Sequence, residues 1–336
     1  MTIYDISKMA GVSIATVSRV LNGNNNVKPE TKKKVLDVME QCGYTPNAFA
    51  RGLGLNTMKT IGILCTDSSD LYLAKAIYFI EQNLRAGGYH SILCCTGYDL
   101  SNKKSALSLL LTQKVDGVIM VGSNFIEPDD ADNQYIREAA AQIPVTLLNA
   151  DFDYPNVFCT LCDDFKAVQE AALGLIDSGI HDILYLYNSR SYSGMKKLSG
   201  YQSACLLRDL PLKKEYQQYY PGGHEDVDGI CRFLCDLSSE GLTFHAVLAS
   251  EDILAIAATK YAKLHNLKIP DDLSIIGYNN SILVSCCEPE LTSVDNRLED
   301  ICQQLVKTLI DTLNGIQMPQ KTIFSARLIR RGTTTF

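Results

Sequence analysis

The sequence predicts a small all-α unit at the N-terminus followed by an α/β core of two lobes. The chain has 336 residues, more than one hydrophobic core usually supports. The first 59 residues contain successive helix start and stop signals, whereas from Thr60 onward apolar runs alternate with helical stretches. A content of 46% hydrophobic and 21% charged residues is typical of a folded globular protein.

The two regions carry opposite net charge. Residues 1–59 hold six Lys and two Arg against two Asp and two Glu, a net charge of +4, which leaves −11 for the remainder of a chain whose net charge is −7. Binding to nucleic acid depends largely on Lys and Arg that neutralise phosphates. Only the N-terminal unit therefore has the charge expected of a nucleic-acid-binding surface.

The first two expected helices are separated by a tight turn. Thr2 and Asp5 can cap a helix at Ile3–Ala10, because their side-chain oxygens accept hydrogen bonds from otherwise unpaired amides of the first turn. Gly11 suits the turn, and a second helix is expected from the N-cap Ser13 through Leu21. The pattern is a helix-turn-helix.

A third helix is expected from Pro29 to just before Gly43, with three lysines at its start that suit phosphate contact. On the second helix, Val17, Val20 and Leu21 fall on the side that faces the other helices. The opposite side is free to enter a major groove and carries Ile14, Ala15, Ser18, Arg19 and Asn22.

The run TIYDISKMAGVSIATVSRVLNGNNNVKPETKKKVLDVMEQCGYTPNAFARGL resembles the headpiece of the LacI/GalR family along its whole length and is especially similar to the catabolite control protein subgroup. The resemblance implies a sequence-specific DNA-binding transcription regulator, with a helix-turn-helix domain at 1–46 and a hinge at 47–59. It makes Ile14, Ala15 and Arg19 base-reading positions, and Arg19 can form a fork with a guanine. The other DNA-contacting positions that it implies are Thr16, Ser18, Asn22, Tyr44, Ala50 and Leu53.

The hinge is a poor helix by itself, because Gly52 and Gly54 each cost about 1 kcal/mol relative to alanine. In the family it becomes helical on the operator, and a leucine from each subunit wedges into the minor groove. Leu53 matches that leucine. The alternative is a plain linker in which Leu53 packs on the core.

The core pattern indicates parallel sheets covered by helices on both faces, because near-continuous apolar strands are separated by helical stretches. Helices are expected near 72–86 and 101–113. The expected strands are TIGILCTD, SILCCTG, GVIMVGS and VTLLN in a first set, and ILYLYN, AVLAS and LSIIGYN in a second.

Two such lobes resemble the periplasmic-binding-protein fold, and the family resemblance extends more loosely to about Arg331. It implies an N-terminal lobe of residues 60–161 and 292–324, a C-terminal effector-binding lobe of 162–291 and a tail of 325–336. Chain crossings are expected near 160–163, 290–293 and 321–325. Ligands of open parallel sheets bind beyond the carboxyl ends of the strands, which here means a cleft between the lobes.

Several positions of that cleft depart from the family pattern. Lys197 stands where an arginine usually holds sugar hydroxyls, Glu251 replaces a frequent asparagine and Asn279 a frequent aspartate. There is no tryptophan, so stacking on a sugar would fall to Tyr72, Phe125, Phe152 or Tyr192. The full expected effector set is Asp67, Tyr72, Phe125, Asn149, Lys197, Glu251 and Asn279.

The expected function is a repressor controlled by a small, sugar-like effector. A nucleobase, a phosphorylated metabolite or a phosphoprotein co-regulator stays open as the effector, and a solute-binding module without regulation is a second class of function. The C-terminal RLIRRGTTTF lacks the leucine heptads of a tetramerising coiled coil, so we expect a homodimer and a pseudo-palindromic double-stranded operator.

Catalysis, a metal site and a cofactor are not expected. Cys159 and Cys162 form a lone C-x-x-C, which is a weak zinc or redox signal without a second ligand pair. The twelve cysteines are expected to be reduced thiols. The N-terminus has no export signal and no apolar run reaches membrane-spanning length, so we expect a cytoplasmic protein without membrane contact.

Overall fold

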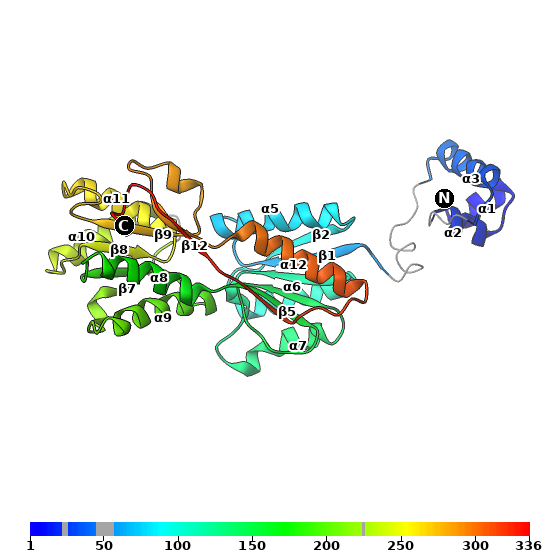
Figure 1. Ribbon diagram of the computed structural model, residues 1–336. Coiled ribbons are helices and arrows are strands. Elements are labelled where there is room, and N and C mark those ends of the chain that lie inside the picture. Colours follow the sequence, from blue (N-terminus) through cyan, green and yellow to red (C-terminus); the bar gives the residue numbers. More distant parts are fainter. Residues whose placement is uncertain (22–25, 45–56, 224–225) are drawn as a thin grey trace. The chain divides into compact units, whose positions relative to one another are not determined.

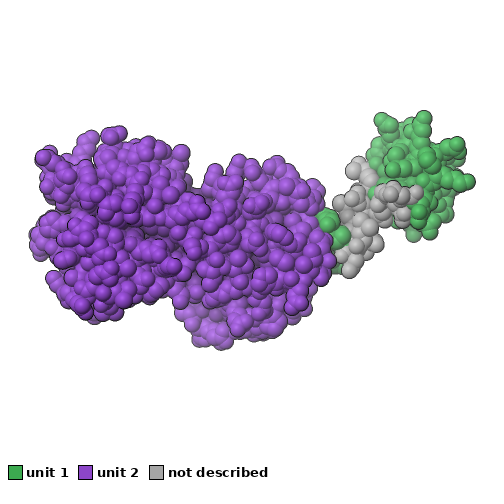
Figure 2. All heavy atoms as spheres, viewed as in Figure 1, with its two compact units in different colours: residues 1–60, 114–116 green, residues 61–113, 117–336 purple. Residues whose placement is uncertain are grey.

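The computed structural model describes residues 1–21, 26–44, 57–223 and 226–336, which form two compact units. One unit comprises residues 1–60 with 114–116, and the other 61–113 with 117–336 (Figure 2). The first is helical and the second is a two-lobed α/β core, so the predicted fold class is confirmed (Figure 1). Within the described ranges, no helix is both long and apolar enough to cross a membrane.

The first unit contains α1 (Ile3–Ala10), α2 (Ile14–Leu21) and α3 (Pro29–Gln41). At the start of α1 the Asp5 carboxylate accepts hydrogen bonds from the Thr2 backbone N, at 2.8 Å, and from its Oγ1, at 3.0 Å. These contacts hold the pKa of Asp5 below its usual value. The buried side chains that the three helices share are Ile6, Ala10, Val17, Val20, Val35 and Met39.

The turn between α1 and α2 depends on two residues. Gly11 has a φ of +60°, a left-handed conformation in which a Cβ would be strained. Ser13 then caps α2, because its Oγ accepts from the Thr16 backbone N at 3.1 Å. The helix-turn-helix geometry therefore follows from the local sequence.

The N-terminal lobe contains one sheet of order β11-β5-β4-β3-β1-β2, in which the four strand pairs with a recorded register are parallel. α5 and α12 pack against each other and cover one face of this sheet, where they contact buried side chains of β1 and β3. Its strands are β1 (Thr60–Cys65), β2 (His90–Cys95), β3 (Gly117–Val121), β4 (Val145–Leu148), β5 (Val157–Cys162) and β11 (Lys321–Phe324). Its helices are α5 (Leu71–Ala86), α6 (Leu100–Thr112), α7 (Gln134–Ala140), α12 (Leu298–Leu313) and the short η1 (Ser123–Phe125) and η2 (Asp130–Asn133).

The C-terminal lobe contains a second sheet, of order β12-β10-β9-β8-β6-β7, in which only the β10–β12 pair is antiparallel among the described strands. α8 and α9 cover one face and α10 and α11 the other. The strands are β6 (Ile183–Tyr187), β7 (Gln217–Tyr219), β8 (Ala246–Ala249), β9 (Ser274–Tyr278), β10 (Thr292–Asp295) and β12 (Arg327–Ile329). The helices are α8 (Asp164–Asp177), α9 (Tyr192–Leu207), α10 (Val227–Ser239), α11 (Asp252–Leu264), η3 (Lys214–Tyr216) and η4 (Ile282–Ser285).

The second chain crossing lies later than the sequence predicts. The sequence pattern places 292–324 in the N-terminal lobe, but β10 pairs with β9 of the C-terminal lobe, with Thr292 opposite Ile276. The crossing therefore follows Asp295, where Arg297 has a φ of +58° just before α12. A short strand of four residues carries no sequence signal for which of two similar sheets it joins, which explains the error.

The C-terminal tail is part of the C-terminal lobe. β12 pairs with β10, and the Thr333 carbonyl accepts from the Ile275 backbone N at 2.9 Å. The Phe336 ring packs against α8 at Gly174, where an added Cβ would come within 2.3 Å of it. The expectation of a separate tail at 325–336 is thus wrong.

Candidate functional site

The outer side of α2 is exposed. Val17 and Val20 are buried against α1 and α3, whereas Ile14, Ala15 and Arg19 are exposed on the other side of the helix. Ile14 is 40% exposed, although it is apolar. An apolar side chain in the first turn and an arginine in the last turn of one exposed helix are groups of the kind that contact a thymine methyl and a guanine edge in a major groove.

The flanking positions divide into two groups. Thr16, Ser18 and Tyr44 are half-buried, and Tyr44 also packs on the three-helix core. Thr16 Oγ1 lies 2.8 Å from Ser13 Oγ, so this residue helps to form the helix start as well as the surface. The predicted contacts Asn22, Ala50 and Leu53 lie outside the described residues.

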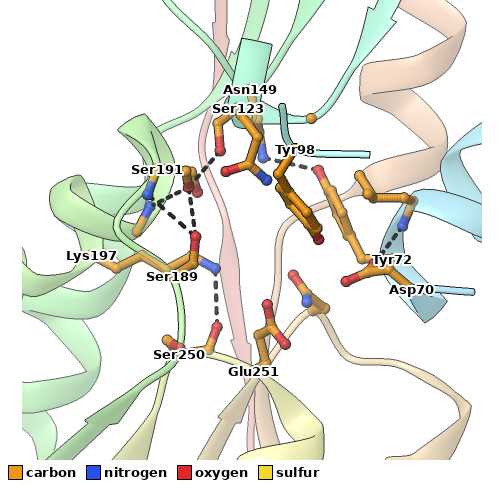
Figure 3. Close-up of a pocket in the computed structure, with 16 residues that line it drawn as sticks. Asp70, Tyr72, Tyr98, Ser123, Asn149, Ser189, Ser191, Lys197, Ser250 and Glu251 are labelled. Carbon is orange, nitrogen blue, oxygen red and sulfur yellow. Dashed lines mark hydrogen bonds between the residues drawn. The ribbon is translucent and has the colours of Figure 1, made fainter. Parts of the chain in front are cut away.

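A polar pocket lies in the core unit between the two lobes, with a cavity volume of about 70 Å³ (Figure 3). The N-terminal lobe contributes Tyr72, Tyr98, Ser123 and Asn149 to it, and the C-terminal lobe faces them with Ser191, Lys197 and Glu251. We call this cavity the polar pocket. Its complete lining is Asp70, Tyr72, Leu73, Tyr98, Gly122, Ser123, Asn124, Asn149, Ser189, Ser191, Ser193, Gly194, Lys197, Ser250, Glu251 and Asn279.

The pocket brings together five of the seven predicted effector residues, namely Tyr72, Asn149, Lys197, Glu251 and Asn279. The other two do not line it. Phe125 is fully buried in the N-terminal lobe, where its carbonyl accepts from Tyr135 Oη at 2.5 Å. Asp67 does not line the pocket either, because its carboxylate accepts from the backbone N of Ser69 at 2.9 Å and from its Oγ at 2.7 Å in the turn after β1.

Lys197 is anchored in the floor of the pocket. Its side chain is 7% exposed, its Nζ donates to the Ser250 carbonyl at 3.0 Å and lies 3.7 Å from the centroid of the Tyr278 ring. Tyr278 Oη in turn donates to the Asp164 carboxylate at 2.5 Å. The ammonium is thus partly satisfied by a carbonyl and an aromatic face before any ligand enters.

Asp164 completes this buried network below the pocket. Its carboxylate is 4% exposed and also accepts from Ser193 Oγ at 2.5 Å. Burial raises the pKa of Tyr278 well above its usual value, and the Asp164 charge adds to the effect. The phenol therefore keeps its proton and stays a donor at neutral pH.

Asn149, at the carboxyl end of β4, forms hydrogen bonds with α5 and with β5. Its φ is +53°, its Nδ2 donates to Tyr72 Oη of α5 at 2.9 Å, and its Oδ1 accepts from the Cys162 backbone N of β5 at 2.8 Å. The amide is therefore engaged on both sides. Asn149 positions Tyr72 in the pocket wall as well as lining the pocket itself.

Two hydrogen bonds connect the lobes beside the pocket. Ser123 Oγ of the N-terminal lobe donates to Ser191 Oγ at 2.8 Å, and Tyr192 Oη donates to the Asp151 carboxylate at 3.3 Å. Ser191 also caps α9, since its Oγ accepts from the Gly194 backbone N. The two lobes are thus bonded directly to each other beside the polar pocket.

Sequence reasoning missed several residues of the lining. Ser123 and Ser250 end the predicted strands GVIMVGS and AVLAS, so their positions at carboxyl ends were a usable signal. Tyr98 directly follows the predicted strand SILCCTG, which was the same kind of signal. Burial, with the nearby Asp67 and Asp70 charges, raises the pKa of Tyr98 to about 12. Tyr98 is thus a neutral donor in the pocket.

The C-x-x-C residues do not face one another. Cys159 Sγ lies 3.3 Å from the Phe152 backbone N, and Cys162 Sγ lies 3.8 Å from Tyr278 Oη. Residues three apart on β5 point to opposite faces of the strand. Burial raises the pKa of Cys159 to about 11, which favours the neutral thiol.

Comparisons with known proteins agree with this architecture. Residues 2–47 match the family described as bacterial regulatory proteins, lacI family, and residues 173–334 match the periplasmic binding protein-like domain. The chain is 54% identical over its whole length to an HTH-type transcriptional regulator of Lachnoclostridium phytofermentans, all of which is covered. It is 31% identical to catabolite control protein A of Priestia megaterium, over 96% of this chain and 98% of that protein.

Among solved structures, the lac repressor dimer bound to operator and the anti-inducer ONPF superimposes with a TM-score of 0.86, at 23% identity over 99% of this chain and 98% of that one. The complex of the transcriptional regulator CelR with cellobiose gives 0.72, at 23% identity over 99% and 100% of the two chains. These likenesses show the fold. The family match and the sequence relatives establish that the chain belongs to the lacI family of bacterial regulatory proteins.

Proposed function

We propose that the chain is a transcriptional repressor that binds a pseudo-palindromic operator as a homodimer and is controlled by a small effector in the polar pocket. The observation that carries the proposal is the exposed side of α2. Its residues Ile14, Ala15 and Arg19 are exposed to solvent and do not belong to the three-helix core. The headpiece boundary at 46 and the hinge at 47–59, with Ala50 and Leu53 as minor-groove contacts, are part of the same proposal.

The effector is proposed to be sugar-like. Hydroxyl groups line the polar pocket from both lobes, and the two tyrosines on the N-terminal side provide ring faces for a sugar. Among structural neighbours, CelR was solved with cellobiose and the lac repressor with ONPG.

The edge of the N-terminal sheet supports self-association. β2 is an edge strand on which Ile92 is 36% and Leu93 44% exposed. An apolar edge strand is usually covered in the working protein, because its unpaired backbone groups otherwise invite aggregation. We propose that a second copy covers it, and that the dimer acts in the cytoplasm, where its operator is.

Binding of selected DNA tests the proposal. Duplexes enriched by the full chain from a random pool should contain inverted half-sites, and the affinity measured by fluorescence anisotropy should fall steeply with salt. A chain without residues 1–59 should lose this binding while keeping its effector-induced thermal shift. Enrichment of no symmetric sequence, or equal binding by the truncated chain, would overturn the proposal.

A further inference from the structure

A thiol and an imidazole meet where two helices of the C-terminal lobe pack together. α10 and α11 lie against each other on one face of the sheet (Figure 1). The Asp228 carboxylate of α10 pairs with the Lys260 ammonium of α11. Further along the same two helices, Cys235 of α10 contacts His265, the C-cap residue of α11, with 3.5 Å between Sγ and Nε2. Neither Cys235 nor His265 lines the polar pocket.

The surroundings of His265 suit a positively charged imidazole. An imidazole in contact with a thiol can take the thiol proton, and the thiolate that remains is the nucleophile. His265 lies at the carboxyl end of α11, where the helix dipole favours a cation. Its ring centroid also lies 4.5 Å from that of Tyr261, and an aromatic face attracts a positive charge. An imidazolium opposite the Cys235 sulfur is therefore supported from two sides.

A second thiol supports a thiolate at the same place. Cys231 precedes Cys235 by about one helical turn on α10 and is 3% exposed. Burial raises the pKa of the Cys231 thiol, and its interaction with the neighbouring Cys235 adds to the effect. Cys231 therefore keeps its proton, which it can donate to a thiolate. The half-buried Cys235 thus has both an imidazole and a protonated thiol as partners.

Cys286 provides the contrast within the same lobe. It is exposed, but its Sγ donates to the Ile282 carbonyl at 3.3 Å. A carbonyl oxygen accepts a hydrogen bond from a thiol and repels a thiolate, so this contact favours the unreactive form. Cys235 is less exposed than Cys286 but has the partners that stabilise a thiolate. Exposure and thiolate stabilisation therefore rank these two cysteines in opposite orders.

We propose that Cys235 is a site of reversible S-thiolation, at which a low-molecular-weight disulfide forms a mixed disulfide with the chain. The Cys235 thiolate attacks one sulfur of a disulfide RSSR, so that a new S–S bond forms to that sulfur and the old S–S bond breaks. The bonding electrons leave on RS⁻, which takes up the proton that His265 received from Cys235. The products are the mixed disulfide and RSH, and a second small thiol reverses the step by the same exchange.

The test is a competition between the thiols of the folded full-length chain. Less than one equivalent of dithiodipyridine, a neutral aryl disulfide, is added at neutral pH. The remaining thiols are blocked with iodoacetamide, and mass spectrometry of the digested chain locates the label. Cys235 should carry more label than any other cysteine, and about tenfold or more than Cys286. Dithiothreitol should remove the label, and unfolding the chain in urea before the reaction should abolish the preference.

A histidine variant and its control assign the reactivity to the imidazole. His265→Gln should lower the rate of labelling at Cys235 about fivefold or more, because glutamine cannot take the thiol proton. It should leave the rate at Cys286 unchanged. The matched control is His245→Gln, since His245 is an exposed histidine of the same lobe whose recorded partner is the Asp182 carboxylate. The control should change neither rate.

Two substitutions test the buried thiol. Cys231→Ser keeps a hydrogen-bond donor and should leave the rate at Cys235 within about twofold of the native rate. Cys231→Ala removes the donor and should lower that rate about threefold or more. Equal rates in the two variants would overturn the role given to the Cys231 thiol.

Two results would overturn the inference as a whole. Faster labelling of the exposed Cys95 or Cys286 than of Cys235 would mean that exposure alone sets the reactivity of these thiols. An unchanged rate at Cys235 in His265→Gln would mean that the imidazole does not activate the sulfur.

Discussion

Tyr278 and Tyr185 form a matched pair for measuring what one buried hydrogen bond contributes to the C-terminal lobe. Both side chains are 0% exposed, and they stand on β9 and β6 of the same sheet. Tyr278 Oη donates to the Asp164 carboxylate at 2.5 Å, whereas Tyr185 Oη has no hydrogen-bond partner among the described residues. The change Tyr→Phe at either position removes one hydroxyl and keeps the ring.

The expected effects differ in size and sign. Tyr278→Phe deletes a hydrogen bond to a carboxylate that is 4% exposed, so the free energy of unfolding should fall by about 1.5–3 kcal/mol. The melting temperature of the core transition should then fall by roughly 3–9 °C. Tyr185→Phe removes a hydroxyl that is buried without a partner, so it should be neutral or stabilise by about 1 kcal/mol.

Differential scanning calorimetry at pH 7 measures both variants beside the native chain. The ring of Tyr278 stays under the Lys197 ammonium in the phenylalanine variant, so the difference reports the hydroxyl rather than the aromatic contact. The reasoning is refuted if Tyr185→Phe destabilises the core as much as Tyr278→Phe does. That result would mean that loss of the hydroxyl's packing, and not of its hydrogen bond, sets the cost.

Three further changes test other parts of the chain. Arg19→Ala should weaken binding to a selected operator by about 1–3 kcal/mol with little effect on random DNA, and equal losses on both duplexes would contradict a base-reading role. Burial raises the pKa of Asp252 from 3.8 to about 6, so the folded chain keeps this proton longer than the unfolded chain. Stability should therefore decline by up to about 3 kcal/mol as pH rises from about 4 to 6, and Asp252→Asn should flatten that decline in urea titrations. Phe336→Ala should lower the free energy of unfolding by about 1–3 kcal/mol, because the ring is half-buried against Gly174. An unchanged calorimetric transition would show that the tail does not stabilise the lobe.

Local signals predicted the helical unit well. Each of its helices begins or ends at a residue with one clear role, such as the caps Asp5 and Ser13 or the left-handed Gly11, and these roles depend only on neighbours in sequence. The buried strands of the core were equally predictable, because apolar runs such as GVIMV are buried at every position. The assignment of Thr292–Asp295 failed because sheet membership depends on distant partners.

Part of the candidate site was also predictable from local sequence signals. Asn149 and Asn279 follow apolar strands directly, and the carboxyl ends of parallel strands meet in the cleft. Phe125 also follows such a strand, but it turns into the N-terminal lobe within η1. Whether a residue just past a strand faces the ligand or the core is decided by the turn it enters, and a single sequence does not contain that information.

Lys197 lies in the floor of the polar pocket, where the family pattern usually has an arginine. An arginine at this place can present a planar fork to a sugar, but a lysine is a point charge, and here a carbonyl and an aromatic face hold it. The polar groups of the walls, among them Ser123, Ser189 and Ser191, are therefore the further candidates for contact with a ligand. Because the floor is tied through Tyr278 to the buried Asp164, changes in the walls can alter ligand preference without disturbing the packing of the C-terminal lobe. Ser123 is a wall residue outside the Asp164 network, so Ser123→Ala should change ligand binding more than it changes the unfolding transition.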